Sequence, residues 1–225
     1  MLVKDWMSKH VITVDTNDSM HEATKLLKEH NIRMLPVMKK SKLVGIVTDR
    51  DLKNASASDA TSLEIHELLY LLMKVKVKEI MTRNPITIPS NYTVEETAAI
   101  LLSNKISGAP VVDHSGGLVG VITKTDLFRV LISLTGVGKK GIQFAFQIED
   151  SPGSIKELAD VIRAFGGRMV SILTSYDGVP EGFRRVYIRM YGVDRLKIRD
   201  LKEELGKVGA LIYMVDHRDN IREIY

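Results

Sequence analysis

The chain has 225 residues, with 32 basic and 28 acidic side chains, a net charge of +4 and no cysteine. The lack of cysteine excludes disulfides and thiolate metal sites. The basic excess is small and interspersed, unlike the clustered basic face of a nucleic-acid-binding protein. The apolar runs are too short to cross a bilayer, and the first residues lack a signal-peptide pattern. We therefore expect a cytoplasmic protein of two domains, with neither nucleic acid nor membrane among its partners.

The first part of the chain repeats itself. Residues 43–52 (LVGIVTDRDL) recur as residues 118–127 (LVGVITKTDL). A shift that places Val3 on Val77 also aligns most of the sequence between these strings, so chance does not explain the match. Self-similarity of this kind indicates two copies of one structural unit.

Each copy predicts a β-α-β-β-α unit. The first helix begins with the S/T-x-x-E spacing of a capping box, at Ser19 in one copy and Thr93 in the other. Apolar residues follow with helical spacing, and a proline then ends the helical pattern before two strands joined by a turn. Neither unit alone is large enough to enclose a core, so we expect the two to pack against each other. The first strands are expected at 12–14 and 86–88.

Beyond the second copy the pattern changes. Residues 136–141 are rich in glycine and predict a linker. The remaining segment predicts strands and helices in the order β-α-β-β-α-β, which is the ferredoxin-like arrangement. We therefore expect four parts: a first repeat with a connecting helix at 66–74, a second repeat, the linker and a C-terminal domain, at 1–75, 76–135, 136–141 and 142–225.

These motifs resemble two known families. Residues 3–135 resemble a tandem pair of cystathionine-β-synthase-type (CBS) domains, or Bateman module, through the doubled Gly-h-h-Thr-x-x-Asp string. Residues 141–217 resemble an ACT domain through the element order and the Asp-Ser-Pro-Gly turn that ends at Gly153. The whole arrangement is similar to bacterial acetoin-utilisation proteins of the CBS–CBS–ACT type. The resemblance implies an α+β fold, with two CBS repeats packed as a pair and followed by a ferredoxin-like ACT domain.

A threonine and an aspartate stand three residues apart at the end of each repeated string, as Thr48 with Asp51 and as Thr123 with Asp126. This spacing at a strand-to-helix junction is typical of helix capping. A carboxylate can also accept hydrogen bonds from both hydroxyls of a ribose, and a threonine hydroxyl can donate to a phosphate near a helix N-terminus. The resemblance implies this second use, with an adenosine nucleotide (AMP, ADP, ATP or S-adenosylmethionine) as a regulatory ligand. The two roles are compatible.

The cations near these pairs differ between the copies. The first copy offers Arg33 and Arg50 for the phosphates, whereas the second offers Ser107 and Lys124. If these side chains bind phosphate rather than remaining solvated, the two sites should differ in affinity. Two further residues are expected to line the base pocket or to belong to the core: Ile12 and Ile86.

The C-terminal segment carries a second candidate site at Asp150, Gly153 and Ser154. ACT domains bind amino acids at this turn, across a dimer interface. Many of them also use an asparagine at the start of the second strand, where this chain has residues 169–171, Met-Val-Ser. That departure favours a purely dimer-forming role over amino-acid binding.

No catalytic constellation is visible, because the six histidines lack metal-ligand spacing and neither a phosphate-binding loop nor a nucleophile motif occurs. We therefore expect a homodimeric regulatory protein, not an enzyme, that acts on an unidentified target protein. The linker at 136–141 would transmit a change in the repeats' relative orientation. The alternative is a dimeric interaction subunit that controls a partner enzyme or transporter and has degenerate nucleotide sites.

Overall fold

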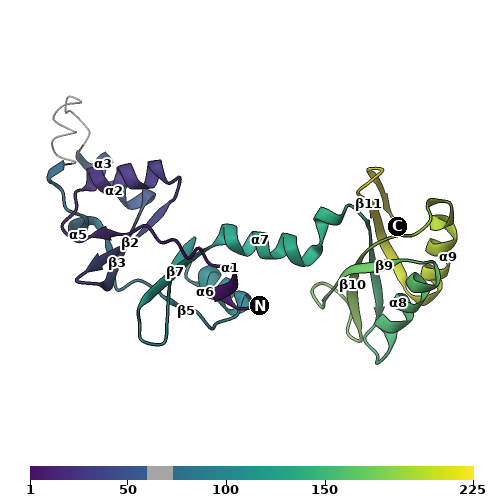
Figure 1. Ribbon diagram of the computed structural model, residues 1–225. Coiled ribbons are helices and arrows are strands. Elements are labelled where there is room, and N and C mark those ends of the chain that lie inside the picture. Colours follow the sequence, from purple (N-terminus) through teal and green to yellow (C-terminus); the bar gives the residue numbers. More distant parts are fainter. Residues whose placement is uncertain (60–72) are drawn as a thin grey trace. The chain divides into compact units, whose positions relative to one another are not determined.

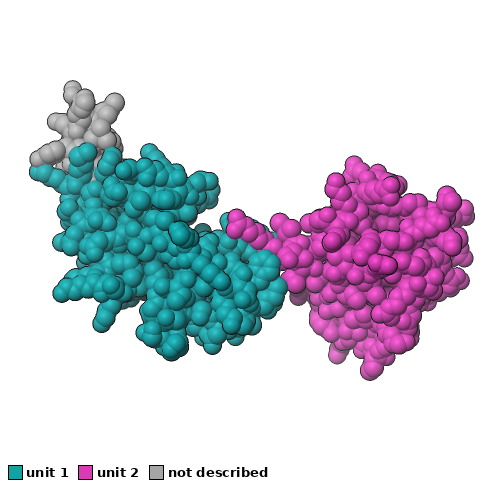
Figure 2. All heavy atoms as spheres, viewed as in Figure 1, with its two compact units in different colours: residues 1–128 teal, residues 129–225 magenta. Residues whose placement is uncertain are grey.

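The computed structural model describes residues 1–59 and 73–225, so nearly all of the helix expected at 66–74 falls outside it. Contacts divide the chain into two compact units, Met1–Phe128 and Arg129–Tyr225 (Figure 2). The division falls inside the helix α7 (Lys124–Thr135) rather than at the glycine-rich segment.

The first unit contains both repeats apart from the later part of α7, and each repeat has the expected β-α-β-β-α order (Figure 1). In both, the first strand runs parallel to the second, which pairs antiparallel with the third. The elements of the first copy are β1 (Val14–Asp15), α2 (Met20–Glu29), β2 (Met34–Lys39), β3 (Lys42–Thr48) and α3 (Asp49–Asp59). Those of the second are β5 (Ile88–Pro89), α6 (Val94–Ser103), β6 (Gly108–Val112), β7 (Leu118–Thr123) and α7 (Lys124–Thr135).

The first strand of each copy begins two residues later than expected. Val14 pairs with Val37, and Ile88 pairs with Val111, so these short strands reach only the later part of β2 and β6. The residues that precede them have no ladder partner. The apolar alternation in the sequence therefore begins before the first hydrogen-bonded residue of each strand, which explains the early predicted start.

The N-terminal segment of each copy packs on the other copy. Val3 is fully buried in the core of the second repeat, and its amide donates to Tyr92 O over 2.9 Å. Val77 is fully buried in the core of the first repeat, and its amide donates to Asp18 O over 2.9 Å. Neither core is complete without the other copy. The exchanged elements are α1 (Val3–Trp6), α5 (Val77–Ile80) and β4 (Thr82–Arg83).

The glycine of each repeated string makes this exchange possible. A Cβ atom at Gly120 would lie 2.4 Å from Met7 Sδ, and one at Gly45 would lie 2.7 Å from Met81 Sδ. Met7 and Met81 are counterparts in the two copies and reach the glycines from the exchanged segments. The glycine is therefore required for close packing at this point of the strand.

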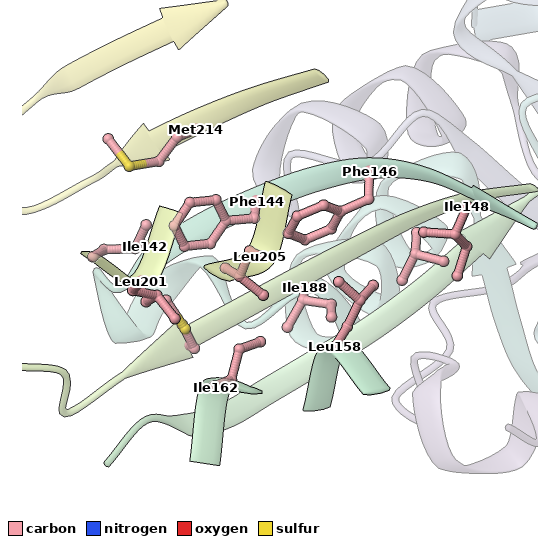
Figure 3. Packing of buried hydrophobic residues seen from close by; sticks show 12 residues of the cluster. Ile142, Phe144, Phe146, Ile148, Leu158, Ile162, Ile188, Leu201, Leu205 and Met214 are labelled. Carbon is pink, nitrogen blue, oxygen red and sulfur yellow. The ribbon is translucent and has the colours of Figure 1, made fainter. Parts of the chain in front are cut away.

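The second unit has the ferredoxin-like topology. Its antiparallel sheet has the order β12-β11-β8-β10-β9, and the apolar faces of two helices pack on one side of it (Figure 3). Phe144 and Phe146 stack in this core with their ring centroids 5.9 Å apart. One strand, β12, was not expected. The elements are β8 (Ile142–Glu149), α8 (Ser154–Ala164), β9 (Arg168–Ser175), β10 (Phe183–Tyr191), α9 (Ile198–Val208), β11 (Ala210–Asp216) and β12 (Ile221–Ile224).

The C-terminal end of α7 is held inside the second unit. Thr135 O accepts hydrogen bonds from Arg189 Nε over 2.7 Å and from Ser171 Oγ over 3.1 Å. Arg189 is only 3% exposed, and burial lowers the pKa of its guanidinium from the ordinary value. Since the carbonyl end of a helix carries partial negative charge, it suits this buried cation. The segment expected to be a linker begins directly after this contact, and Gly136 packs against Val170.

Candidate functional site

Both Thr–Asp pairs form the same hydrogen-bonded array. Asp51 Oδ2 accepts from Thr48 N over 2.8 Å and from Thr48 Oγ1 over 2.7 Å, while Asp51 N donates to Thr48 Oγ1 over 3.3 Å. The corresponding distances for Thr123 and Asp126 are 2.9, 2.7 and 3.4 Å. The capping role is therefore present in both copies, at the N-termini of α3 and α7.

This array limits how the pairs could hold a ligand. Each threonine hydroxyl has one proton, and it is donated to the aspartate. A phosphate could receive that proton only if the hydroxyl turned away from the carboxylate. Among the described residues, nothing donates a hydrogen bond to Asp51 Oδ1, so this oxygen can accept from a ribose without disturbing the cap. The Asp51 carboxylate thus fits a ribose directly, whereas the threonine of either pair fits a phosphate only after rearrangement.

The structure places Arg33 and its counterpart Ser107 at equivalent positions, and likewise Asp49 and its counterpart Lys124. Arg33 O accepts from Asp49 N over 3.1 Å, and Ser107 O accepts from Lys124 N over 2.9 Å. The residue before the second strand therefore adjoins the start of the helix in both copies. Arg33 and Lys124 are exposed, as is Arg50. The first copy thus has two arginines beside its helix N-terminus, and the second copy has one lysine.

The two isoleucines expected at the base pocket differ in their surroundings. Ile12 is partly buried and packs against the first core, whereas Ile86 is 40% exposed. Ile86 is the more accessible of the two for contact with a base. Both lie two residues before a first strand, at the end of the sheet where β2 and β6 begin opposite Thr48 and Thr123.

In the second unit, Arg184 was missed by the sequence analysis. Arg184 NH2 donates to Ser154 Oγ over 3.0 Å, and Arg184 Nε lies 3.4 Å from Asp150 Oδ1. Gly153 adopts φ 99° just before α8, which a glycine tolerates best. The arginine lies on β10, opposite Ile148, so only strand pairing brings it to this turn. The candidate amino-acid site is therefore already occupied by a cation of the same chain.

Among the described residues, no group of three potential ligands could hold a metal ion. No helix in that part of the chain is long and apolar enough to span a membrane. Among the hollows formed by the described residues, one of about 540 Å³ lies in the first unit and one of about 600 Å³ in the second. Neither is lined by the Thr–Asp pairs or by the Asp150 turn.

Comparison with known proteins identifies the first unit. The profile of the CBS domain matches residues 3–58 and 77–133. A CBS domain-containing protein of Dictyostelium discoideum is 36% identical over 135 residues, which cover 60% of this chain and 93% of that relative.

Two solved structures agree with this match. The CBS domain pair of protein MJ0100, in complex with 5'-methylthioadenosine and S-adenosyl-L-methionine, is 38% identical with a TM-score of 0.51, and the match covers 62% of this chain and 98% of that one. A Vibrio cholerae protein named for acetoin utilization is 26% identical with a TM-score of 0.51, over 62% of this chain and 96% of that one. With its two copies of the β-α-β-β-α unit, the chain belongs to the CBS domain family and carries a tandem pair of these domains.

Proposed function

We propose that the chain is a non-catalytic regulatory protein whose CBS pair binds an adenosine ligand at Thr48 with Asp51 and at Thr123 with Asp126. CBS pairs are regulatory ligand-binding modules, and the MJ0100 pair was solved with two adenosine compounds. The observation that carries the proposal is the identical Thr–Asp array in both copies, with a carboxylate oxygen of Asp51 left over from the cap. The helix N-terminus beside each array favours an anionic group.

We propose that the second unit is an ACT domain whose main role is to join two copies of the protein. The ferredoxin-like topology supports this assignment, and β9 has no outer neighbour in the described sheet. Because Arg184 already binds Asp150 and Ser154, we rank amino-acid binding at this turn below dimerisation. The likeness to a protein named for acetoin utilization supports a role in that metabolism, through a target protein not yet identified.

A second candidate function is a dimeric interaction subunit with degenerate nucleotide sites. The observation that favours it is the threonine hydroxyl, whose proton is donated to the aspartate in both copies. This reading predicts no stabilisation by any adenosine compound.

Titration calorimetry tests the sensor and its two unequal sites. We expect ATP to bind about tenfold more tightly at the first copy, because Arg33 and Arg50 contribute more charge-assisted hydrogen bonds than Lys124 alone. Replacement Arg33→Ser reproduces the second copy and should bring the two affinities together. S-adenosylmethionine has no phosphate, so its two affinities should differ less. Two equal ATP sites would contradict the proposed asymmetry, and no heat from AMP, ADP, ATP or S-adenosylmethionine would contradict the sensor itself.

We propose that α7 transmits the binding signal. Its first turn carries Asp126, and its last residue, Thr135, is held by Arg189 in the second unit. A ligand can shift the second unit only if it binds one arrangement of this helix better than another. In this proposal, α7 and its contact with Arg189 transmit the signal, a role that the sequence analysis gave to the linker at 136–141.

Replacement Arg189→Gln should uncouple the two units without weakening ligand binding. It removes the guanidinium that binds Thr135 O, so the helix end loses its main contact. In the unmodified protein, ligand should slow amide hydrogen exchange around Thr135 and along β10, and in the variant this effect should disappear. The matched control is Arg185→Gln, since Arg185 lies on the same strand and donates to Gly178 O instead. Retention of the ligand effect in Arg189→Gln would rule out this route.

A further inference from the structure

A hollow of about 540 Å³ lies at the end of the first sheet opposite to the Thr–Asp pair. Strand β2 begins at Met34, whose partner is Thr48, and it ends at Lys39, which lines the hollow. The hollow is therefore separate from the proposed adenosine site at Thr48 and Asp51. Its volume falls within the range of small-molecule sites, roughly 300 to 1,000 Å³.

Three cations from three different elements line this hollow. Lys39 ends β2, Lys78 belongs to α5, and Arg83 belongs to β4. The last two come from the segment that the second copy contributes to the first. Backbone hydrogen bonds fix that segment, since Lys78 N donates to Thr16 O over 3.1 Å and Asn84 N donates to Val44 O over 3.3 Å.

In the described part of the chain, these cations have no ion-pair partner. Within the described residues, Lys39, Lys78 and Arg83 form no ion pair, and no carboxylate lines the hollow. The carboxylates of the adjacent turn are engaged with its own backbone. Asp15 Oδ1 accepts from Asn17 N over 2.9 Å, and Asp18 Oδ2 accepts from Asp15 N over 2.8 Å. The side chains of Asn17 and Asn84 add hydrogen-bonding groups to the lining.

The second copy lacks this arrangement. The counterpart of Lys39 is Asp113, whose Oδ1 accepts from Ser115 N and Gly117 N, each over 2.8 Å. These hydrogen bonds, with that of the Ser115 hydroxyl, hold the pKa of the Asp113 carboxyl below its ordinary value, so it is anionic at neutral pH. A carboxylate therefore stands where the first copy has its lysine. The equivalent surface, with Lys4 and Lys9, is the internal comparison for the hollow.

We propose that this hollow binds a small polyanion, that is, a molecule bearing more than one phosphate group. Three converging cations with no anionic partner suit several phosphate oxygens, and charge-assisted hydrogen bonds to them are the strong ones. The hydrogen-bond donors of Asn17 and Asn84 could serve the remaining oxygens. This site is separate from the pair formed by Thr48 and Asp51, because Lys39 stands at the other end of β2.

The test is calorimetric titration of the full chain with inorganic tripolyphosphate at about 150 mM salt, where weak surface pairing is screened. We expect one molecule bound per chain at this site. Arg83→Gln should weaken binding roughly tenfold or more, as expected for the loss of one charge-assisted contact. Lys39→Asp, which reproduces the second copy, should abolish it. Two controls should leave binding unchanged: Lys9→Gln, the counterpart of Arg83, and Arg33→Ser, which alters the adenosine site.

Two results would overturn the proposal. One is the absence of tripolyphosphate binding by a chain whose circular dichroism shows it to be folded. The other is equal weakening by Lys9→Gln and Arg83→Gln, since that would mean general attraction to surface charge. Neither result bears on adenosine binding, which is measured separately with the nucleotides.

Discussion

Replacing both aspartates, Asp51→Ala with Asp126→Ala, should abolish the stabilisation of the first unit by its adenosine ligand. A ligand at a hundred times its Kd adds about 2.7 kcal/mol for each site. For a unit of this size, that is roughly a 10 °C rise in Tm. Each proposed ribose contact uses the aspartate of its pair, and Asp51 Oδ1 remains available beside its cap, so loss of both side chains should remove this rise. Differential scanning calorimetry with S-adenosylmethionine and with ATP measures it.

Loss of the helix caps alone would also lower Tm, so a matched cap variant is needed. Thr93 and Glu96 form the same three hydrogen bonds at the start of α6, with distances of 2.7, 2.9 and 3.1 Å. These bonds hold the pKa of the Glu96 carboxyl below its ordinary value, as expected for a capping carboxylate. Glu96→Ala should therefore lower Tm and keep the full ligand response. If the aspartate variants also keep it, the Thr–Asp pairs serve only as caps.

Gly141→Ala should destabilise the second unit by about 3 kcal/mol or more, at the upper end of the effect of inserting a methyl group into a packed site. A Cβ atom at this position would lie 2.0 Å from Met190 O and 2.9 Å from Met190 C. The obstacle is backbone, and Met190 is paired with Ile142 in the β8–β10 ladder. The strand cannot move away without breaking the sheet.

The control for this substitution is Gly138→Ala, because nothing lies within 4 Å of a Cβ atom there. The single tryptophan, Trp6, packs in the first unit and gives a separate signal for it. During urea unfolding, Gly141→Ala should lower the urea midpoint of the second unit, followed by far-UV circular dichroism. The midpoint of the first unit, followed by Trp6 fluorescence, should not change. An unchanged circular dichroism transition would show that the glycine is not required.

Local signals in the sequence predicted much of the fold. The doubled string, the capping box at Thr93 and the ferredoxin-like order all depend on neighbouring residues, and the structure contains each of them. At Ser19 the box is half formed: its hydroxyl accepts from Glu22 N over 3.1 Å, but the Glu22 carboxylate does not accept from Ser19 N. The sequence could not distinguish the two cases, because the glutamate side chain also has solvent as a partner.

Features that depend on distant pairing were not predicted. The only sequence signal of the exchanged N-terminal segments is the glycine of each repeated string, Gly45 and Gly120. Its role became clear only when the structure placed Met81 and Met7 against these glycines. Arg184 reaches the Asp150 turn only through strand pairing, and Arg189 reaches Thr135 in the same way. The sequence did identify the Thr–Asp pairs as candidate site residues. Their internal hydrogen bonds decide which atoms remain for a ligand, and those required the structure.

The exchanged segments also make the first unit a single thermodynamic body. If one repeat unfolds, it withdraws Val3 or Val77 from the other, and a cavity of that size opens in a core that is otherwise intact. Unfolding one repeat therefore costs the free energy of that repeat and also destabilises the core of the other. We expect the two repeats to unfold in a single transition. A molecule bound at either Thr–Asp pair then stabilises both repeats, so the two sites are linked even when no shape change passes between them.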